Sequence, residues 1–225
     1  MFYEDRRHAG RSLARALSRY EGRPNVVVLA LPRGGVPVAD EVAGALHAPL
    51  DVFVVRKLGF PGHDEFAMGA IASGGIRVLD LPLIRRYGIS SEEVADVAAR
   101  EEVELRRRER LYRGDGPRPP LAGRIVILVD DGLATGASMR AAVEAVRTQD
   151  PARIVVAVPV GPRETVRDLS RVADEVVCVA TPDPFLAVGR FYANFDQTTD
   201  EEVFELLARA RARELSGAAL AAGGR

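Results

Sequence analysis

Residues 126–138 constrain the fold of this 225-residue chain more than any other segment. They read Val-Ile-Leu-Val-Asp-Asp-Gly-Leu-Ala-Thr-Gly-Ala-Ser, and the four apolar residues at the start are typical of a strand in a parallel sheet covered on both faces. Two carboxylates and a loop of small residues follow, and residues 139–146 then have helical spacing. This order predicts a loop that closes around a phosphate at a helix N-terminus.

The acidic pair Asp130 and Asp131 stands directly before this loop. Carboxylates at that place can accept hydrogen bonds from neighbouring sugar hydroxyls, while the hydroxyls of Thr135 and Ser138 join the backbone N–H groups around a phosphate. Together these residues predict a phosphosugar site. The alternative is an ordinary strand-to-helix corner with a solvated acidic pair, which a pattern of this length disfavours.

The rest of the chain alternates between apolar strands and amphipathic helices, which predicts an α/β fold with a doubly wound parallel sheet of about five strands. A final helix begins at Asp200, with Thr199 as its N-cap, and residues 216–225 are expected to form a frayed tail. The predicted strands are residues 26–31, 51–55, 124–129, 153–159 and 175–180, and the predicted helices before the last one are residues 5–20, 36–46, 137–149 and 163–172.

A long insertion separates the second predicted strand from the third. Residues 67–71 and 76–79 are joined by Ala-Ser-Gly-Gly and predict a hairpin. Residues 91–112 predict a highly charged helix whose thin apolar stripe indicates an exposed, arm-like helix rather than a core helix. Glutamates interleave with the arginines of residues 106–110, so a solvated, salt-bridged face is favoured over a nucleic-acid site. The stripe consists of Val94, Val97, Leu105 and Leu111.

Cations and glycines follow the first two predicted strands. Arg33, Gly34 and Gly35 form a turn in which the backbone can approach an anion and a guanidinium can pair with it. Lys57 is the only lysine among 31 lysine and arginine residues, and with Arg56 it follows the second strand. Because ligands of open α/β sheets bind at the carboxyl ends of the strands, Lys57 is a candidate site residue, although one lysine must fall somewhere by chance.

Composition excludes several classes of protein. The formal charge of −1 gives no general basic field for a nucleic-acid partner. The single cysteine, Cys178, cannot form an internal disulfide, the first residues lack the apolar core of a signal peptide, and no apolar run has the length of a membrane span. We therefore expect a cytoplasmic protein with neither a nucleic-acid nor a membrane partner.

The histidines do not predict a metal centre. His8, His47 and His63 stand in no arrangement with metal-ligand spacing, apart from the sequence His63-Asp-Glu65, whose adjacent side chains diverge in an extended loop. Glu65 is instead a candidate carboxylate for an acceptor amine.

The segment 126–138 resembles the PRPP-binding motif of type I phosphoribosyltransferases, where PRPP is 5-phosphoribosyl 1-diphosphate. It departs from that motif at Gly132, where the family more often has an aliphatic residue. Residues 31–35, Leu-Pro-Arg-Gly-Gly, look like the pyrophosphate loop of the same family, in which the peptide before the position of Gly34 is often cis. Residues 5–10, 55–59 and 65–69 extend the resemblance over nearly the full chain, to a bacterial group whose acceptor is not established.

This resemblance implies a magnesium-dependent phosphoribosyltransferase that moves the 5-phosphoribosyl group from PRPP to a nitrogenous acceptor and releases diphosphate. Mg²⁺ would be held mainly by PRPP, without a direct protein site. Lys57, Asp130 and Asp131 would act in catalysis. The ribose and 5-phosphate would bind to Asp130, Asp131, Gly132, Leu133, Ala134, Thr135, Gly136, Ala137 and Ser138. The diphosphate would bind to Arg33, Gly34, Gly35, Arg56 and Lys57.

The resemblance also implies a hood over the acceptor, formed by residues 1–22 and 181–215 of a single domain. The core would be residues 24–56 and 121–181, and residues 57–120 would be a mobile loop and arm. Phe185, Tyr192 or Phe195 could stack on an acceptor ring, or could simply pack the hood against the sheet. Dimers are common in the family, so the resemblance is compatible with a homodimer.

Ala134 gives information about the class of acceptor. Phosphoribosyltransferases that act on 6-oxopurines generally have an aspartate at this position, so the resemblance disfavours such acceptors. Two other functions stay open: a regulator that senses PRPP or a nucleotide without turnover, and a nucleotide-binding partner that docks through the charged helix 91–112.

Overall fold

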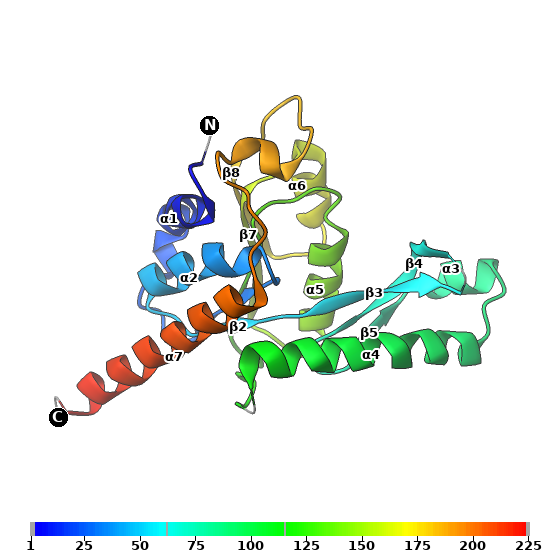
Figure 1. Ribbon diagram of the computed structural model, residues 1–225, viewed down its shortest axis with the longest axis horizontal. Helices are drawn as coiled ribbons and strands as arrows, with labels where there is room; N and C mark the ends of the chain where they lie inside the picture. The colour runs from blue at the N-terminus through cyan, green and yellow to red at the C-terminus, as the bar shows by residue number, and fades with distance from the viewer. Residues whose placement is uncertain (1–2, 62, 115, 224–225) are drawn as a thin grey trace.

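A five-stranded parallel sheet with the strand order β2-β1-β6-β7-β8 forms the centre of the protein (Figure 1). The computed structural model describes residues 3–61, 63–114 and 116–223, and only the backbone of residues 63–66 and 217–223. Strands β1 and β6 are buried at every position, because helices cover both faces of the sheet. The predicted α/β fold is therefore confirmed. The strands are β1 (Val26–Ala30), β2 (Leu50–Val52), β6 (Ile125–Val129), β7 (Arg153–Val160) and β8 (Glu175–Ala180).

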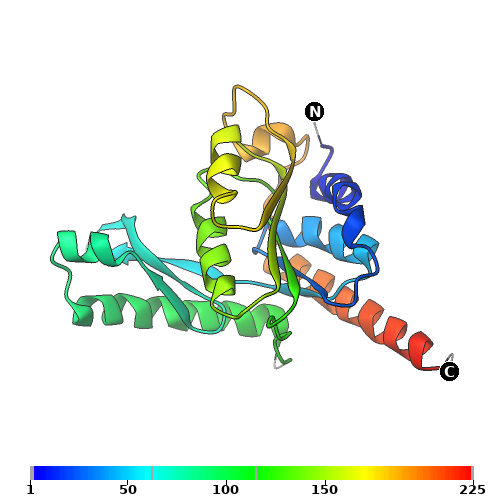
Figure 2. The same ribbon diagram turned by 180° about the vertical axis from the view of Figure 1, so that it is seen from behind.

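Three helices pack on one face of this sheet and two on the other (Figures 1 and 2). The first face carries α1 (Arg6–Ala16), α2 (Gly35–Leu46) and α7 (Asp200–Gly223), and the second carries α5 (Ala137–Arg147) and α6 (Arg163–Leu169). Thr199 caps α7 as predicted, since its Oγ1 accepts a hydrogen bond of 3.1 Å from the N–H of Glu202. The helix continues to Gly223, where a frayed tail was expected, because the segment is rich in alanine. Two short 3-10 helices are η1 (Ser18–Tyr20) and η2 (Val188–Phe191).

The order of the strands places the carboxyl ends of β1 and β6 side by side. The chain passes from β1 to β2 on one side and then returns to add β6 on the other, so its direction of winding reverses between β1 and β6. The N–H of Leu31 donates to the carbonyl of Val129 at 2.8 Å, and this bond keeps the two ends together. Ligands of doubly wound sheets bind at such a reversal.

A second, antiparallel sheet with the order β3-β4-β5 forms an arm that extends away from the core (Figures 1 and 2). The predicted hairpin corresponds to β4 (His63–Ala72) and β5 (Ile76–Leu79). The third strand, β3 (Val55–Phe60), was expected to be the end of a core strand and a loop. The core strand stops at Val52 instead, because the chain turns there into the arm. The arm also contains α3 (Leu81–Arg86) and α4 (Ser91–Arg113).

Helix α4 differs from the exposed helix that the sequence predicted. Val94, Val97 and Leu105 of its apolar stripe are buried, and so is Tyr112, whereas Leu111 is exposed. The second sheet supplies an apolar face on which this stripe packs, and that sheet could not be seen in the sequence pattern. The helix also carries the predicted ion pairs between glutamates and arginines.

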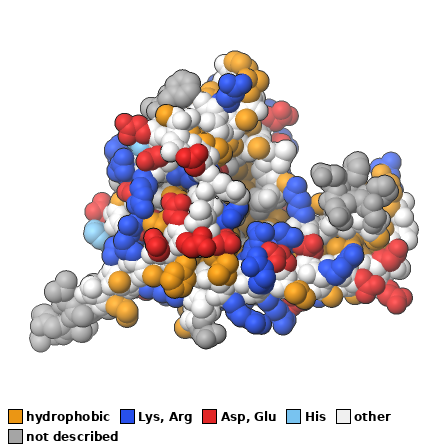
Figure 3. Space-filling model, viewed as in Figure 1, with side chains coloured by type: hydrophobic (Ala, Val, Ile, Leu, Met, Phe, Trp, Pro, Cys, Tyr) orange, Lys and Arg blue, Asp and Glu red, His pale blue; other side chains and the backbone are white. Residues whose placement is uncertain are grey.

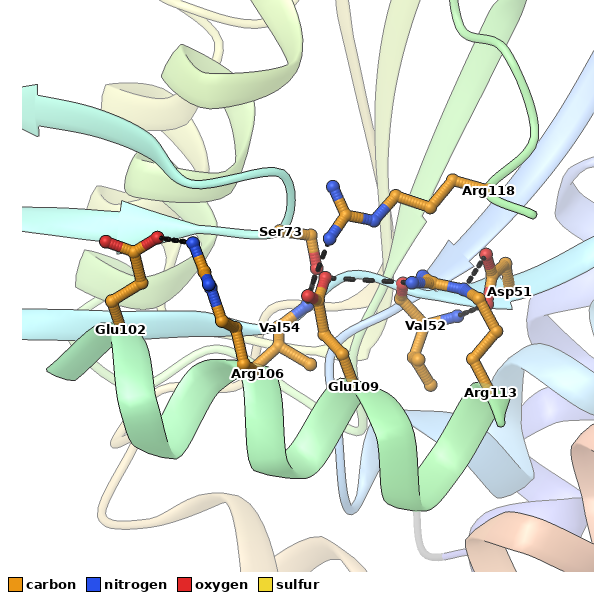
Figure 4. Close-up of polar contacts among 9 residues, drawn as sticks. All are labelled: Asp51, Val52, Val54, Ser73, Glu102, Arg106, Glu109, Arg113 and Arg118. Carbon is orange, nitrogen blue, oxygen red and sulfur yellow. Dashed lines mark hydrogen bonds and ion pairs between the residues drawn. The ribbon is translucent and has the colours of Figure 1, made fainter. Parts of the chain in front are cut away.

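A buried ion pair fixes the base of the arm to the core sheet (Figure 4). Arg113 at the end of α4 donates from Nε to Asp51 Oδ2 at 2.8 Å and from Nη2 to the carbonyl of Val52 at 3.0 Å. Both side chains are almost fully buried. Burial raises the pKa of Asp51, and the Arg113 guanidinium opposes this rise. Close by, Arg118 pairs with the buried carboxylate of Glu109 at 2.6 Å.

Acidic and basic side chains are mixed on the face seen in Figure 3, in keeping with the formal charge of −1. Among the helices that the structure describes, none has the length and apolar character needed to cross a bilayer.

Candidate functional site

A cavity of about 480 Å³ opens where β1 and β6 end. Four segments line it: the first turn of α1, the turn after β1, the segment after β6 with the start of α5, and η2 with the loop that follows it. The sequence predicted the second and third of these as parts of one site, and the structure brings them together. The lining residues are Arg6, Arg33, Gly34, Asp130–Met139, Val188, Phe195, Gln197 and Thr198.

Close packing holds the loop after β6 in place. A Cβ at Gly132 would lie 2.5 Å from Val188 Cγ1 at the start of η2, so a larger residue does not fit at position 132. The N–H of Leu133 donates to the carbonyl of Val160 at 2.9 Å, and Thr165 Oγ1 donates to the carbonyl of Ala134 at 3.0 Å. These contacts tie both sides of the loop to β7 and α6, so the loop presents a fixed backbone to the cavity.

Helix α5 begins directly after the last residue of this loop. Gly136 has φ = +73°, and a Cβ there would also lie 2.6 Å from Thr165 Cγ2. Ala137 is the first helical residue, and Thr135, Ala137 and Ser138 line the cavity. The first N–H groups of a helix have no partner within it and carry a partial positive charge, so this helix start favours an anion such as a phosphate.

The acidic pair lies directly in front of the helix start. Asp130 Oδ1 accepts a hydrogen bond of 2.8 Å from the backbone N–H of Asp131, which fixes the Asp130 carboxylate against the backbone of its neighbour. Burial raises the pKa of Asp130, and the neighbouring Asp131 raises it further. Burial also raises the pKa of Asp131, but Arg6 opposes this rise through an ion pair of 2.9 Å between Nε and Oδ2. The two carboxyls therefore differ, since only Asp131 has this direct cationic partner.

The turn after β1 approaches the acidic pair closely. A Cβ at Gly35 would lie 2.8 Å from the carbonyl oxygen of Val129, and Gly34 packs against the carboxyl group of Asp131. Arg33 is half-buried in the cavity wall, with Nη1 3.7 Å from Asp200 Oδ1. The cis peptide joins Pro32 to Arg33, one residue earlier than the family resemblance implied.

The other two predicted cations lie outside this cavity. Arg56 Nη2 is 2.7 Å from Glu101 Oε2 on α4, on the opposite side of the arm. Lys57 is exposed on β3 and lines a neighbouring hollow of about 520 Å³ between the arm and α5. Thr135 and Ser138 line that hollow too, so Lys57 lies beside the predicted 5-phosphate loop rather than with Arg33.

The aromatic residues of the hood divide into packing residues and one cavity residue. Phe185 stacks on Phe191 with their ring centroids 5.3 Å apart. Tyr192 is buried, and its hydroxyl donates to the carbonyl of Asp131 at 2.5 Å. Burial raises the pKa of this phenol. Phe195 is partly exposed and lines the cavity. The predicted acceptor contact Glu65 lies outside the side chains that the structure describes.

Arg6, Gln197 and Thr198 line the cavity but were not predicted as site residues. Arg6 lies in residues 5–10, which share the family resemblance but predicted no role for this side chain. A signal was present, because a positive charge in the first turn of a helix opposes the helix dipole and indicates a carboxylate partner elsewhere. Gln197 and Thr198 follow η2 in an irregular segment, where no periodicity predicts which side chains point inward.

Within the described residues, no group of three or more His, Cys, Asp or Glu side chains comes together in a metal-binding arrangement. The two carboxylates of Asp130 and Asp131 offer oxygen ligands of the kind that Mg²⁺ prefers, and one of them already pairs with Arg6. This arrangement fits a magnesium ion that arrives with a phosphate-rich ligand better than an all-protein magnesium site.

Comparisons with known proteins identify the family of this chain. Residues 3–195 match the phosphoribosyl transferase domain family. In two strains of Mycobacterium tuberculosis, H37Rv and CDC 1551, a protein named provisionally as a phosphoribosyl transferase is 49% identical over 208 residues, which are 92% of this chain and 47% of the relative. The chain thus spans about half the length of these curated relatives.

Among solved structures, the crystal structure of the protein TT1426 from Thermus thermophilus superimposes with a TM-score of 0.84 at 48% identity. The match covers 93% of this chain and 99% of that one, so it includes the arm as well as the core. The acidic pair, the loop and the α5 start all lie within the matched family segment. The chain belongs to the phosphoribosyl transferase domain family.

Proposed function

We propose that this protein transfers the 5-phosphoribosyl group of PRPP to a nitrogenous acceptor and releases diphosphate. The observation that carries the proposal is the 480 Å³ cavity, in which two carboxylates, a helix N-terminus and an arginine next to a glycine pair line one space. These are the three groups that a ribose, a phosphate and a diphosphate require.

Each part of PRPP has a place in this proposal. The 5-phosphate would bind at the start of α5, with the backbone of residues 132–138 and the hydroxyls of Thr135 and Ser138. Asp130 and Asp131 would accept hydrogen bonds from the ribose hydroxyls. Arg33 and the N–H groups beside Gly34 would hold the diphosphate, since Arg33 is the predicted cation that lines the cavity.

A magnesium ion would neutralise charge on the leaving diphosphate when it binds together with PRPP. PRPP would supply most of the contacts to this ion, and Asp130 and Asp131 are the residues of the cavity that would help to hold it.

Catalysis in this site would come from positioning and electrostatics. Diphosphate leaves C1 of the ribose as the acceptor nitrogen attacks from the opposite face, through an oxocarbenium-like transition state. The fixed carboxylates would hold the ribose on one side. Arg33 would stabilise the negative charge that develops on the departing diphosphate in the transition state. Phe195 lines the cavity on the hood side and would limit the access of water to C1.

The acceptor would enter on the hood side, where Phe195, Gln197 and Thr198 line the cavity. Ala134 also lines it, and a methyl group can neither donate to nor accept from a purine ring nitrogen. A 6-oxopurine is therefore disfavoured as the acceptor. The alternative proposal, a sensor that binds PRPP or a nucleotide without turnover, uses the same site and differs only in the absence of diphosphate release.

Measurement of diphosphate release tests the proposal. The protein is incubated with PRPP and Mg²⁺ and with a panel of nucleobases and amines, in parallel with Asp131→Asn. We expect release that depends on one class of acceptor and falls tenfold or more in the variant. Asp168→Asn is the matched control, because Asp168 lies on α6 and does not line the cavity. PRPP binding without release for any acceptor would favour the sensor instead.

A further inference from the structure

A separate hollow of about 560 Å³ lies where α1, α2 and α7 meet, with α2 between the other two helices (Figures 1 and 2). None of the described residues that line it also lines the 480 Å³ cavity. Its cations recur at every fourth position of α1 and of α7, so each helix turns one basic face toward the hollow. We call it the arginine hollow, after its cations Arg7, Arg11, Arg15, Arg209 and Arg213.

Carboxylates of α2 hold part of this group in place. Asp40 is buried, with 3% of its side chain exposed, and it accepts hydrogen bonds from Nη2 of Arg209 and from Nη2 of Arg213. Arg7 Nη1 lies 3.9 Å from Asp40 Oδ2 and 3.5 Å from Glu41 Oε1. Three guanidinium groups thus converge on one buried carboxylate, which leaves an excess of positive charge beside it.

The remaining arginines of the hollow are held less firmly. Arg11 Nη1 lies 3.9 Å from Glu41 Oε1. Among the described side chains, Arg15 has no ion-pair partner, and its Nη2 donates to Ser12 Oγ at 3.1 Å. With Glu21, the hollow contains three carboxylates against five arginines, in a chain whose formal charge is −1. The positive charge is therefore concentrated locally and is not a property of the whole surface.

The guanidinium groups carry more hydrogen-bond donors than the surrounding carboxylates can use. Each has five N–H donors in a fixed plane, and the side chains of Arg7, Arg11, Arg209 and Arg213 are between 39% and 51% exposed. A ligand from solution can therefore reach these donors. Phosphate oxygens accept paired bonds from the arginine fork, and their charge would relieve the repulsion between the clustered cations.

The other lining residues leave space and offer no surface for a base. A Cβ at Gly44 would have Arg213 Cζ as its nearest atom, at 3.9 Å, so packing does not require glycine there, although alanine is more favourable inside a helix. Gly44 instead leaves the hollow open. Among the described residues that line it, none is aromatic, so the hollow has no ring on which a nucleobase could stack.

An anchor between helices accounts for only part of this arrangement. The ion pairs of Asp40 hold α7 against α2, and two arginines are enough for that task. Arg11 and Arg15 make no ion pair with Asp40, yet they line the same space.

We propose that the arginine hollow is a binding site for a compact ligand with several adjacent phosphate groups, which it recognises through the phosphates alone. Such groups occur in inorganic polyphosphate and in phosphate esters, and both would present the same oxygens to the guanidinium groups. The inference does not depend on the proposed function, because the hollow and the 480 Å³ cavity share no lining residue among those described.

The experiment is calorimetric titration with inorganic tripolyphosphate, without Mg²⁺ and at low ionic strength, on the wild type and three variants. Arg11→Gln/Arg15→Gln removes two guanidinium groups that make no ion pair with Asp40, so the links between α2 and α7 are retained. Gly44→Glu adds a carboxylate to the hollow and removes no arginine, so it tests the same site if the double variant fails to fold.

Arg167→Gln/Arg171→Gln is the matched control. It removes two exposed arginines from α6, which line neither the arginine hollow nor the 480 Å³ cavity. Tripolyphosphate that enters the 480 Å³ cavity would contribute equally in all four proteins. Circular dichroism establishes that each variant is folded.

We expect micromolar binding to the wild type that weakens as salt is added, because salt screens the attraction between the charges. The affinity should fall tenfold or more in Arg11→Gln/Arg15→Gln and in Gly44→Glu, and should stay unchanged in the α6 control. A nucleoside triphosphate should bind no more tightly than tripolyphosphate, as judged from the part of its binding that Gly44→Glu removes.

Equal affinity of all four proteins for tripolyphosphate would overturn the inference. An equal loss in the α6 control would overturn it too, since the effect would then follow the net charge of the protein and not the hollow. A nucleoside triphosphate that binds to the hollow tenfold more tightly would contradict recognition through the phosphates alone. PRPP binding is measured separately, so its failure would count against the proposed function and not against this site.

Discussion

Gly34 and Asp131 are in contact across the junction of β1 and β6, and the contact leaves no room for a side chain. A Cβ at position 34 would lie 2.8 Å from Asp131 Cγ and closer still to Oδ2, with Arg6 Nε at 3.2 Å. The sequence predicted glycine at position 34 because it allows the backbone to approach an anion. The structure shows a second requirement for glycine there, because its close packing also sets the position of the acidic pair.

Replacement of Gly34 by alanine should displace the Asp131 carboxyl and weaken its ion pair with Arg6. We expect PRPP affinity to fall tenfold or more, measured by calorimetry, while the fold is retained. Gly44→Ala, in the helix that Gly34 precedes, is the control, since its Cβ would meet its nearest atom, Arg213 Cζ, at an ordinary 3.9 Å. That variant should gain about 0.5–1 kcal/mol of unfolding free energy and bind PRPP normally. Equal PRPP affinity in both variants would contradict the role of Gly34.

Arg33 and Lys57 should differ in their effect on catalysis. Arg33 lines the main cavity, whereas Lys57 lines the hollow beyond Thr135 and Ser138. Because charge stabilisation of diphosphate requires direct contact, Arg33→Ala should lower the rate of diphosphate release tenfold or more, and Lys57→Ala should lower it less. The measurement is the steady-state rate of diphosphate release by each variant at saturating PRPP, compared with that of the wild type. A larger loss in Lys57→Ala would mean that the arm carries Lys57 into the site during turnover.

Asp130→Asn should stabilise the protein while it weakens PRPP binding. The pKa of Asp130 is raised in the folded state, so its ionised form reduces the free energy of unfolding at pH values above that pKa. Asparagine has no charge and can still accept the hydrogen bond from the N–H of Asp131. We expect a gain of about 1 kcal/mol at pH 8, measured by urea unfolding, because one pKa unit corresponds to about 1.4 kcal/mol.

The gain in Asp130→Asn should shrink as the pH falls and should vanish below about pH 4, because the carboxyl of the unfolded state then becomes protonated as well. A variant that is less stable than the wild type at pH 8 would show that Asp130 is not a destabilising buried charge.

Arg113→Gln should destabilise the protein through the junction between the arm and the core. The variant leaves the buried carboxyl of Asp51 without its cation, which usually reduces the free energy of unfolding by about 3–5 kcal/mol. The loss should be smaller at pH 5 than at pH 8, because Asp51 can then become neutral by binding a proton. Arg110→Gln, on the exposed side of the same helix, is the control and should change stability by less than about 0.5 kcal/mol. Similar losses in the two variants would contradict the anchoring role.

The central strands and the phosphate loop could be predicted from the sequence because their signals are local. Residues 126–138 contain the strand, the acidic pair, the loop and the helix start within one continuous pattern, and the structure has them in that order. The juxtaposition with the turn at Gly34 also followed, since parallel strands with helical crossovers bring their carboxyl ends to one edge.

The arm and the hood could not be predicted to the same depth, because their side chains are placed by contacts between distant segments. Lys57 was expected at the end of a core strand, but the chain leaves the core at Val52 and forms β3 in a second sheet. Arg6 meets Asp131 across 125 positions of sequence, and no period relates the two. Tyr192 was considered for an acceptor ring, yet its hydroxyl donates to the backbone of Asp131, a contact that composition does not reveal.

Calorimetric titration of the wild-type protein with PRPP, with and without Mg²⁺, tests the central claim most directly. Our account predicts magnesium-dependent binding in the micromolar range, which is abolished when Asp130 and Asp131 are both replaced by asparagine. The double variant should remain folded, because both substitutions remove charges whose pKa values are raised by burial. An absence of PRPP binding by the wild type under either condition, with the fold intact, would contradict the account.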